Sequence, residues 1–276
     1  MYAYHNTSYT PINDIKVSPC DRGFLLGDGI FETMRASNGK ITHIDQHLKR
    51  FIKSADFFAI DLHESEQSLH SICETLLEKN KLLQHSVSIR ITLTRGLSNR
   101  GINLPDQQRP TILITTTHIK PPATPFISAM ITDIKRNECS PITYHKTLNY
   151  LEPILARSQA QQLGFDEGIM LNTKGAITES SAANLFIVKG GIIYTPPISD
   201  GVLPGIMRDN IIAYCKEHSI PLLEQSIVTD DLLQADEAFQ TNSLIQVQAI
   251  KSINKHTLDT NPGNLTDKIS KILRLL

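Results

Sequence analysis

A lysine, a glutamate and the start of a helix are the parts of this sequence that could perform chemistry. Lys146 lies in a short polar segment before a helical pattern, and Glu179 lies among apolar and small residues in the stretch 175–186. A further predicted helix begins near Ile206, directly after a proline and a glycine. A lysine amine can form a Schiff base with an aldehyde, a carboxylate can stabilise a proton, and the unpaired amides of a helix start can bind an anion. Taken alone, the lysine and the glutamate are also typical of solvated surface charges. A catalytic role for either residue therefore needs support from the other motifs.

The composition excludes several classes of function. The chain has 276 residues, 40% hydrophobic and 20% charged, which is typical of a soluble globular protein with two domains or one large domain. A formal net charge of -1 without a basic stripe argues against nucleic acid as a partner. The four cysteines lie far apart and form no C-x-x-C pair, so neither a zinc site nor a disulfide framework is predicted. Because the sequence shows no signal peptide and no apolar run of about 18 residues, we expect a cytoplasmic protein that does not span a membrane.

The N-terminal part alternates strand and helix patterns. Three glycines within residues 23–29 predict a turn or close backbone packing, and their spacing does not fit a nucleotide-binding loop. Asp45 is a candidate N-cap for the helix that follows, and the apolar periodicity of this helix leaves His47 and Arg50 off the buried stripe. Residues 87–94 alternate apolar and polar side chains, which predicts a strand with one buried face.

Proline and glycine mark the boundaries of the remaining segments. Three prolines within residues 120–125 predict a linker, which divides the chain into a domain over 1–119 and a second domain over 126–276. Within the second domain, the turn signals at 172–175 and 189–191 predict two hairpins.

As a set, these blocks resemble the class IV, or fold-type IV, pyridoxal-phosphate enzymes, which include branched-chain and D-amino-acid aminotransferases and aminodeoxychorismate lyase. The matching blocks run in family order from about Asp21 to Ile250. The resemblance implies a mixed α/β (α+β) fold, with a small N-terminal α/β domain, a larger C-terminal domain that has a β-barrel-like core and carries the cofactor lysine, and a cofactor between the two. It also implies a pyridoxal 5′-phosphate-dependent enzyme that acts on a small-molecule amine, forms a homodimer and requires no metal.

The same resemblance assigns a role to each candidate residue. Lys146 matches the lysine that carries the cofactor, and Glu179 matches the carboxylate beside the pyridine nitrogen. Arg50 matches the arginine of an H-x-x-R-[LF] element that binds the cofactor phosphate, a task suited to a planar guanidinium. The remaining contacts that the resemblance implies are the amides of Ile206 and Met207 and the side chains of Ser243 and Asn242 for the phosphate, and Phe31 and Arg100 for the pocket wall and substrate.

Three motifs distinguish the members of this family. D-amino-acid aminotransferases carry R-x-H, whereas residues 100–102 retain the arginine and lack the histidine. Branched-chain aminotransferases carry a G-T-A run where this chain has Thr-Asn-Ser-Leu at 241–244. Aminodeoxychorismate lyases resemble the chain at 99–101, at 146–152 and at 242–244. At the position of Glu32, however, some lyases have a small or hydroxyl-bearing residue.

These comparisons of motifs favour 4-amino-4-deoxychorismate lyase, which eliminates pyruvate to give 4-aminobenzoate, a folate precursor. A branched-chain or D-amino-acid aminotransferase is the alternative. A protein that binds the cofactor without turnover is a third reading.

Overall fold

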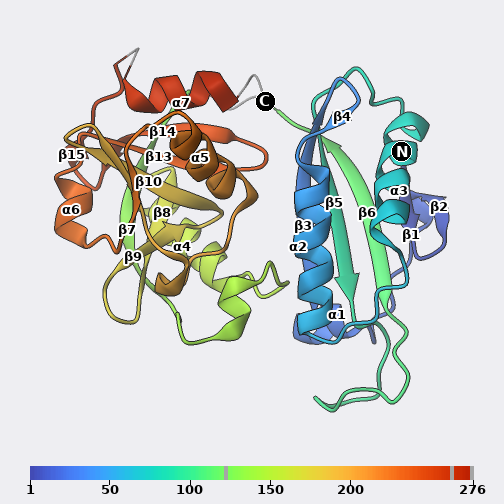
Figure 1. Ribbon diagram of the computed structural model, residues 1–276. Helices are drawn as coiled ribbons and strands as arrows, with labels where there is room; N and C mark the ends of the chain where they lie inside the picture. The colour runs from blue at the N-terminus through green and yellow to red at the C-terminus, as the bar shows by residue number, and fades with distance from the viewer. Residues whose placement is uncertain (121–123, 262–263, 274–276) are drawn as a thin grey trace. The chain divides into compact units, whose positions relative to one another are not determined.

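The computed structural model describes residues 1–120, 124–261 and 264–273. These residues form two compact units, both traced in Figure 1. The predicted linker over 120–125 falls partly outside the described residues, so that boundary stays a prediction.

The first unit, formed by residues 1–120 and 146–149, is an antiparallel sheet with two helices on one face. Its described strands hydrogen-bond in the order β2-β1-β6-β5-β3-β4. The strands are β1 (Tyr2–His5), β2 (Ser8–Pro11), β3 (Gly29–Ser37), β4 (Lys40–Ile41), β5 (Val87–Thr94) and β6 (Thr111–His118). The helices are the 3-10 turn η1 (Ile12–Asp14), α1 (Arg22–Leu26), α2 (Ile44–Phe57) and α3 (Glu66–Lys79).

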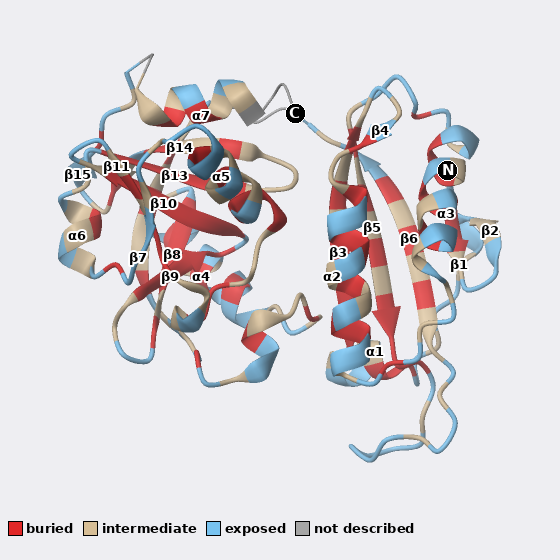
Figure 2. Cartoon of the chain, viewed as in Figure 1, coloured by how far each residue is buried: buried red, intermediate tan, exposed pale blue. Residues whose placement is uncertain are grey.

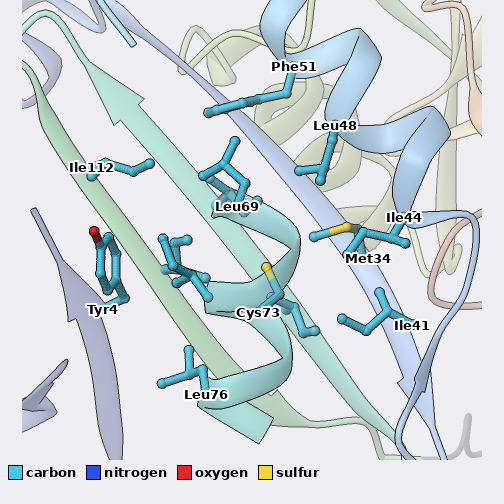
Figure 3. Packing of buried hydrophobic residues seen from close by; sticks show 14 of the residues in the cluster. Tyr4, Met34, Ile41, Ile44, Leu48, Phe51, Leu69, Cys73, Leu76 and Ile112 are labelled. Atoms are coloured by element: carbon cyan, nitrogen blue, oxygen red, sulfur yellow. The ribbon is translucent and has the colours of Figure 1, made fainter. Parts of the chain in front are cut away.

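Alternation along the central strands decides which face of this sheet is covered. In β5, Val87, Ile89 and Ile91 are fully buried, whereas the residues between them are only partly buried. Figure 2 shows the same alternation as red and tan bands along the strands. The buried side chains pack against Leu48 of α2 and Leu69 of α3, whose positions Figure 3 shows. Each such leucine contributes about 1.5 to 3 kcal/mol when fully buried, so burial of this cluster stabilises the packing of the two helices on the sheet.

The start of α2 differs from the prediction. The N-cap is His43, in the left-handed region with φ of 55°, and Asp45 lies within the first turn. The prediction that His47 lies off the buried stripe is wrong: this side chain is 1% exposed. Its burial has a polar cause, because its ring nitrogen lies 2.7 Å from a carboxylate oxygen of Glu32 on the underlying strand.

The second unit, formed by residues from 124 to 145 and from 150 onward, is built on a second sheet. Its strands are β7 (Phe126–Arg136), β8 (Glu167–Asn172), β9 (Ile177–Ser180), β10 (Ala183–Lys189), β11 (Ile192–Thr195), β12 (Leu222–Glu224), β13 (Glu237–Asn242), β14 (Gln246–Ile253) and β15 (His256–Thr257). Its helices are the 3-10 turns η2 (Pro141–Tyr144) and η3 (Ile198–Asp200), and α4 (Leu151–Gln162), α5 (Ile206–Glu217), α6 (Thr229–Leu233) and α7 (Leu265–Leu273).

Strand pairing closes part of this sheet into a barrel. In the described chain, β10, β13, β14, β7, β8 and β9 pair in that order, and β9 pairs back to β10. The β14–β7 and β7–β8 pairs are parallel, and the other pairs of the ring are antiparallel. The prediction of a mixed α/β fold whose C-terminal domain has a β-barrel-like core is therefore confirmed.

The strand β10 contributes to two cores. Leu185 and Ile187 belong to a cluster that includes side chains of α6, whereas Phe186 belongs to a cluster with α5 and α7. Phe186 stacks on Phe239 of β13 with ring centroids 4.9 Å apart. Since both faces of β10 are covered, its seven residues read as a nearly continuous apolar run. Within the part of the chain that the structure describes, no helix is long and apolar enough to cross a membrane.

Candidate active site

The segment that contains Lys146 pairs with the first residues of β3. The carbonyl of Lys146 accepts a hydrogen bond from the amide of Phe31 at 2.8 Å, and the amide of Leu148 donates to the carbonyl of Gly29 at 2.9 Å. The sequence-based division assigns Lys146 to the C-terminal domain, but residues 146–149 belong to the first unit. The physical reason is this pairing, because it satisfies backbone groups at the edge of β3.

Two of the predicted glycines permit this approach. A Cβ atom on Gly29 would lie 2.6 Å from the carbonyl oxygen of Leu93 and 2.8 Å from a methyl carbon of Leu148. Gly27 has φ of 67°, and its carbonyl accepts a hydrogen bond from the side chain of Asn149 at 3.2 Å. The prediction of close backbone packing at these glycines is confirmed, and its function is to bring the lysine segment against the strand.

Two cationic side chains lie next to the aromatic ring of Phe31. The Nζ atom of Lys146 lies 4.4 Å from the ring centroid, and the guanidinium carbon of Arg90 lies 3.7 Å from it. Arg90 also donates from Nε to the hydroxyl of Thr92 at 3.2 Å. Phe31 is buried, whereas Lys146 and Arg90 are half-buried. The ring therefore orients the amine that the sequence singles out, on the face of the sheet opposite to α2 and α3.

On the other face of β3, a buried glutamate pairs with Arg50. Glu32 is 1% exposed, and its two oxygens accept from Nε of Arg50 at 2.7 Å and from Nη2 at 2.9 Å. Burial raises the pKa of Glu32, but the charge of Arg50 and the hydrogen bonds from His47 and Arg50 outweigh this and lower the pKa to about 2. The carboxylate fixes the orientation of Arg50, and the phosphate-binding role of this arginine stays a prediction.

The polar loop that carries Arg100 is held at its base by a second ion-pair group. Arg22 donates to the carbonyls of residues 101–103 at 3.1 to 3.3 Å, and its Nε lies 2.7 Å from Asp28. Arg95 binds the same carboxylate through two nitrogens. Burial raises the pKa of Asp28, yet the hydrogen bonds and charges of Arg95 and Arg22 leave it below its ordinary value. Arg100 itself is exposed, so its proposed contact with substrate stays a prediction.

In the second unit, Glu179 is held by donors from three different segments. Arg136 of β7 lies 3.2 Å from Oε1, the side-chain amide of Asn184 donates to Oε2 at 3.1 Å, and the amide of Leu203 donates to Oε2 at 3.2 Å. The side chain of Glu179 is 8% exposed. A carboxylate with these partners is fixed in position, which is what a partner for a protonated ring nitrogen requires.

The start of α5 lies against the same asparagine. The N-cap is Gly205, which has no side chain of its own to cap the amides that follow it, among them those of Ile206 and Met207. A Cβ atom on Gly205 would lie 1.8 Å from Oδ1 of Asn184, so only glycine allows this approach. The predicted helix start is confirmed, and phosphate binding by its two amides stays a prediction.

The side chain of Asn242 builds the turn between β13 and β14. Its Oδ1 accepts from the amides of Leu244 and Ile245 at 2.9 and 3.0 Å, and its Nδ2 donates to the carbonyl of Ala182 at 3.0 Å. Asn242 therefore shapes the backbone around Ser243. Contact of either side chain with a phosphate stays a prediction.

Comparison with known proteins assigns the chain that carries these residues to a family. The model described as amino-transferase class IV matches residues 29–253, which is most of the chain. The chain belongs to this family. Its members depend on pyridoxal phosphate, so the protein is a pyridoxal-phosphate-dependent aminotransferase or lyase, as the sequence predicts.

Individual relatives of this class IV chain carry different activities. It is 32% identical to a putative branched-chain-amino-acid aminotransferase of Methanocaldococcus jannaschii, over 98% of this chain and 94% of the relative. It is 30% identical to an aminodeoxychorismate lyase of Bacillus subtilis, over 99% and 92%, and 31% identical to a D-alanine aminotransferase of Bacillus licheniformis, over 92% and 89%. The crystal structure of an Escherichia coli branched-chain amino acid aminotransferase superposes with a TM-score of 0.95 at 28% identity, covering 100% of this chain and 94% of that one.

Three functional contacts of this class IV chain are not evident from its sequence. Arg136 and Asn184 hold Glu179 from other strands, and Arg90 lies on the ring beside Lys146. Arg90 occupies a polar position of an alternating strand, which is also typical of a solvent-facing residue. Of these three residues, only Asn184 could have been singled out from the sequence. It is a polar residue within the apolar run of β10, and a buried polar side chain needs hydrogen-bond partners.

Proposed function

We propose that this protein is a 4-amino-4-deoxychorismate lyase, which releases pyruvate and 4-aminobenzoate. The observation that carries the proposal is the turn at 242–244. Its Asn-Ser-Leu sequence resembles the lyases, and the Asn242 side chain makes three hydrogen bonds that define the turn. The Gly-Thr-Ala run of branched-chain aminotransferases has no side-chain amide, which here accepts through Oδ1 and donates through Nδ2, so the pocket wall formed by this turn would differ between the two activities.

The proposal assigns separate tasks to the residues of each unit. Lys146 would carry pyridoxal 5′-phosphate through its Nζ, and Glu179 would stabilise the protonated pyridine nitrogen. The residues fit these tasks, because the amine of Lys146 is oriented by Phe31 and the carboxylate of Glu179 is held by three donors. Arg50 and the amides of Ile206 and Met207 would bind the phosphate, with Asn242 and Ser243 as further candidates. The bound cofactor supplies an electron sink for negative charge on the substrate carbon that bears nitrogen.

The elimination needs one base and one acid, and Lys146 can serve as both. Once the substrate amine has taken the place of Lys146 on the cofactor, the freed Nζ would remove the proton from the carbon that bears the substrate nitrogen. The neighbouring carbon–oxygen bond breaks, and the departing enolpyruvyl group receives a proton from Lys146 and leaves as pyruvate. The ring becomes aromatic 4-aminobenzoate, which makes the step effectively one-way. No keto acid is consumed.

An aminotransferase is the second candidate. It is favoured by the identity of 32% to the branched-chain relative and by the TM-score of 0.95 with the Escherichia coli enzyme. In that reaction, Lys146 would remove the same proton, the bound cofactor would hold the amino group between two half-reactions, and a second substrate with a keto group would be required.

One experiment separates these reactions. The holoenzyme is incubated with aminodeoxychorismate and, separately, with leucine or D-alanine plus 2-oxoglutarate. Fluorescent 4-aminobenzoate with stoichiometric pyruvate, formed without a keto acid, supports the lyase. Glutamate formation without aminobenzoate means that the aminotransferase is the correct activity.

The cofactor assignment needs its own control. Borohydride reduction should place the cofactor label on the peptide that contains Lys146, and Lys146→Ala should abolish both label and turnover. Lys174→Ala, which changes a lysine with 76% side-chain exposure, should leave both intact. A label on a different lysine would contradict the assignment.

We also propose a homodimer in the cytoplasm. Its mass in solution, measured by light scattering, should be twice that of one chain.

A further inference from the structure

One buried carboxylate in the first unit contacts two basic side chains of α2. Glu32 accepts from Nε of Arg50 at 2.7 Å and from Nη2 at 2.9 Å, and Nδ1 of His47 lies 2.7 Å from the oxygen that binds Nη2. Glu32 and His47 are each 1% exposed. His47 and Arg50 are three residues apart on one face of the helix, so both reach the same point of β3. The two basic side chains are therefore coupled through one oxygen atom.

The carboxylate determines which nitrogen of His47 can change its protonation. With its pKa lowered to about 2, Glu32 is ionised at neutral pH and can only accept hydrogen bonds. Nδ1 of His47 must therefore carry a hydrogen and donate it to Glu32. The ring atom that can take up a second proton is Nε2, and histidine is the side chain whose ordinary titration range lies closest to neutral pH.

The charges of Glu32 and Arg50 already balance each other. The phosphate dianion that the proposed function assigns to Arg50 would add two negative charges to this balanced pair. Because Arg50 and His47 share one oxygen, at 2.9 and 2.7 Å, that phosphate would lie within roughly 10 Å of the His47 ring. Charges in a buried environment are screened little over such a distance, so the phosphate would favour a second proton on His47.

We propose that His47 takes up a proton when the cofactor phosphate binds to Arg50. His47 is then a positioning residue, which acts on the phosphate through Glu32 and Arg50 and compensates part of its charge. This role rests on the phosphate contact of Arg50 in the proposed function, and it is the same for a lyase and for an aminotransferase, since both bind the same cofactor. Because binding consumes a proton, the affinity for the phosphate group falls as the pH rises.

Other titratable groups near His47 are less suited to this role. His43 lies one turn earlier on α2, and burial, followed by the neighbouring His47 and Lys40, keeps the pKa of His43 below its ordinary value. Burial raises the pKa of the Cys73 thiol on α3 to about 12, so this thiol stays neutral near pH 7. His43 provides a matched control, because it is a half-buried histidine at the start of the same helix.

The test counts the protons that are taken up when a cofactor analogue binds. The analogue is 4-deoxypyridoxine 5′-phosphate, which lacks the aldehyde that would react with Lys146, and it is added to the full-length chain freed of cofactor. Isothermal titration calorimetry in buffers of different ionisation enthalpy gives the proton count across about pH 6.5 to 8.5.

The wild type should take up roughly half a proton per chain more than His47→Asn, which keeps a donor toward Glu32 but cannot titrate. Its affinity should accordingly fall roughly fivefold more than that of His47→Asn between about pH 7 and 8.5. His43→Asn should match the wild type, since asparagine tolerates the left-handed backbone of that position.

Equal proton counts in the wild type and His47→Asn would overturn the proposal, as would a count that only His43→Asn removes. If His47→Asn did not fold, the imidazole signals of the 15N-histidine-labelled wild type and His43→Asn provide the second measurement. One ring should gain a proton on binding in both proteins, and no gain in any of the ten histidines of the wild type would contradict the role of His47.

Arg50→Ala separates this role from the proposed function. Unchanged affinity of Arg50→Ala for the analogue would contradict the phosphate contact itself. Lost affinity in Arg50→Ala, together with equal proton counts in the wild type and His47→Asn, would contradict only the role of His47.

Discussion

The buried pair between Glu32 and Arg50 should make the stability of the first unit depend on acid pH. Glu32 has a folded-state pKa of about 2, against 4.5 for the ordinary carboxyl. Because the folded value is the lower one, the pair stabilises the fold fully above pH 4.5, and this stabilisation is lost as the pH falls toward 2. A difference of this size corresponds to about 3 kcal/mol in the free energy of unfolding.

Glu32→Gln removes the charge and keeps the shape of the side chain. It leaves Arg50, which is 14% exposed, and the buried His47 beside a neutral amide. Removal of one partner from a buried ion pair typically costs about 3 to 5 kcal/mol, so the variant should unfold at a clearly lower urea concentration at pH 7. It should also lose the part of the dependence on pH between 4.5 and 2 that Glu32 contributes, whereas the part that comes from Asp28 and its arginines should remain.

The assay is urea unfolding followed by circular dichroism across that pH range, supported by hydrogen exchange of peptides from β3 and α2. Glu78→Gln, which changes an exposed glutamate on α3, is the control and should retain the wild-type dependence. If Glu32→Gln showed the same loss of stability with falling pH as the wild type, the ion pair would not be the source of the effect.

Three further predictions concern the proposed site. Glu179→Gln should retain the cofactor but lose turnover by several orders of magnitude, because the pyridinium loses its stabilising charge, and near-normal turnover would show that the glutamate is structural. Arg50→Ala should weaken cofactor binding, measured by equilibrium dialysis, by roughly 2 to 4 kcal/mol. The control is Lys49→Ala at the exposed neighbouring position, which should not weaken binding. Unchanged cofactor affinity in Arg50→Ala would exclude the phosphate role. Arg22→Gln removes the donors to the carbonyls of residues 101–103 and should accelerate tryptic cleavage after Arg100 several-fold, while equal cleavage rates would show that the loop is held by other contacts.

Local patterns predicted the secondary structure well where a single periodicity dominates. The alternation in 87–94 corresponds to β5 without a shift at either end, and the turn signals at 172–175 and 189–191 join β8 to β9 and β10 to β11. The closure of the barrel required the family resemblance. Its parallel pair between β7 and β14 joins residues that are more than a hundred positions apart, and neither strand indicates its partner.

The candidate site was predictable at the motif residues and not at their supports. Lys146 and Glu179 stand out because their chemistry and context match a family motif. His47 and Arg90 did not stand out, because a polar residue outside an apolar stripe reads as solvent-facing until a partner is known. Their partners, Glu32 and Phe31, are adjacent residues on opposite faces of β3, so a single strand orients two different polar side chains.

The pairing of residues 146–149 with β3 also limits how this protein can be divided and recombined. The four residues belong to the first unit, although the chain on both sides of them belongs to the second. A gene fragment that ended at residue 120 would leave the amide of Phe31 and the carbonyl of Gly29 without their partners. Chimaeras built from two class IV enzymes by exchange at the linker would therefore combine a strand from one parent with a lysine segment from the other. We expect such chimaeras to fold well only when the tetrapeptide is transferred together with the strand it was selected to match.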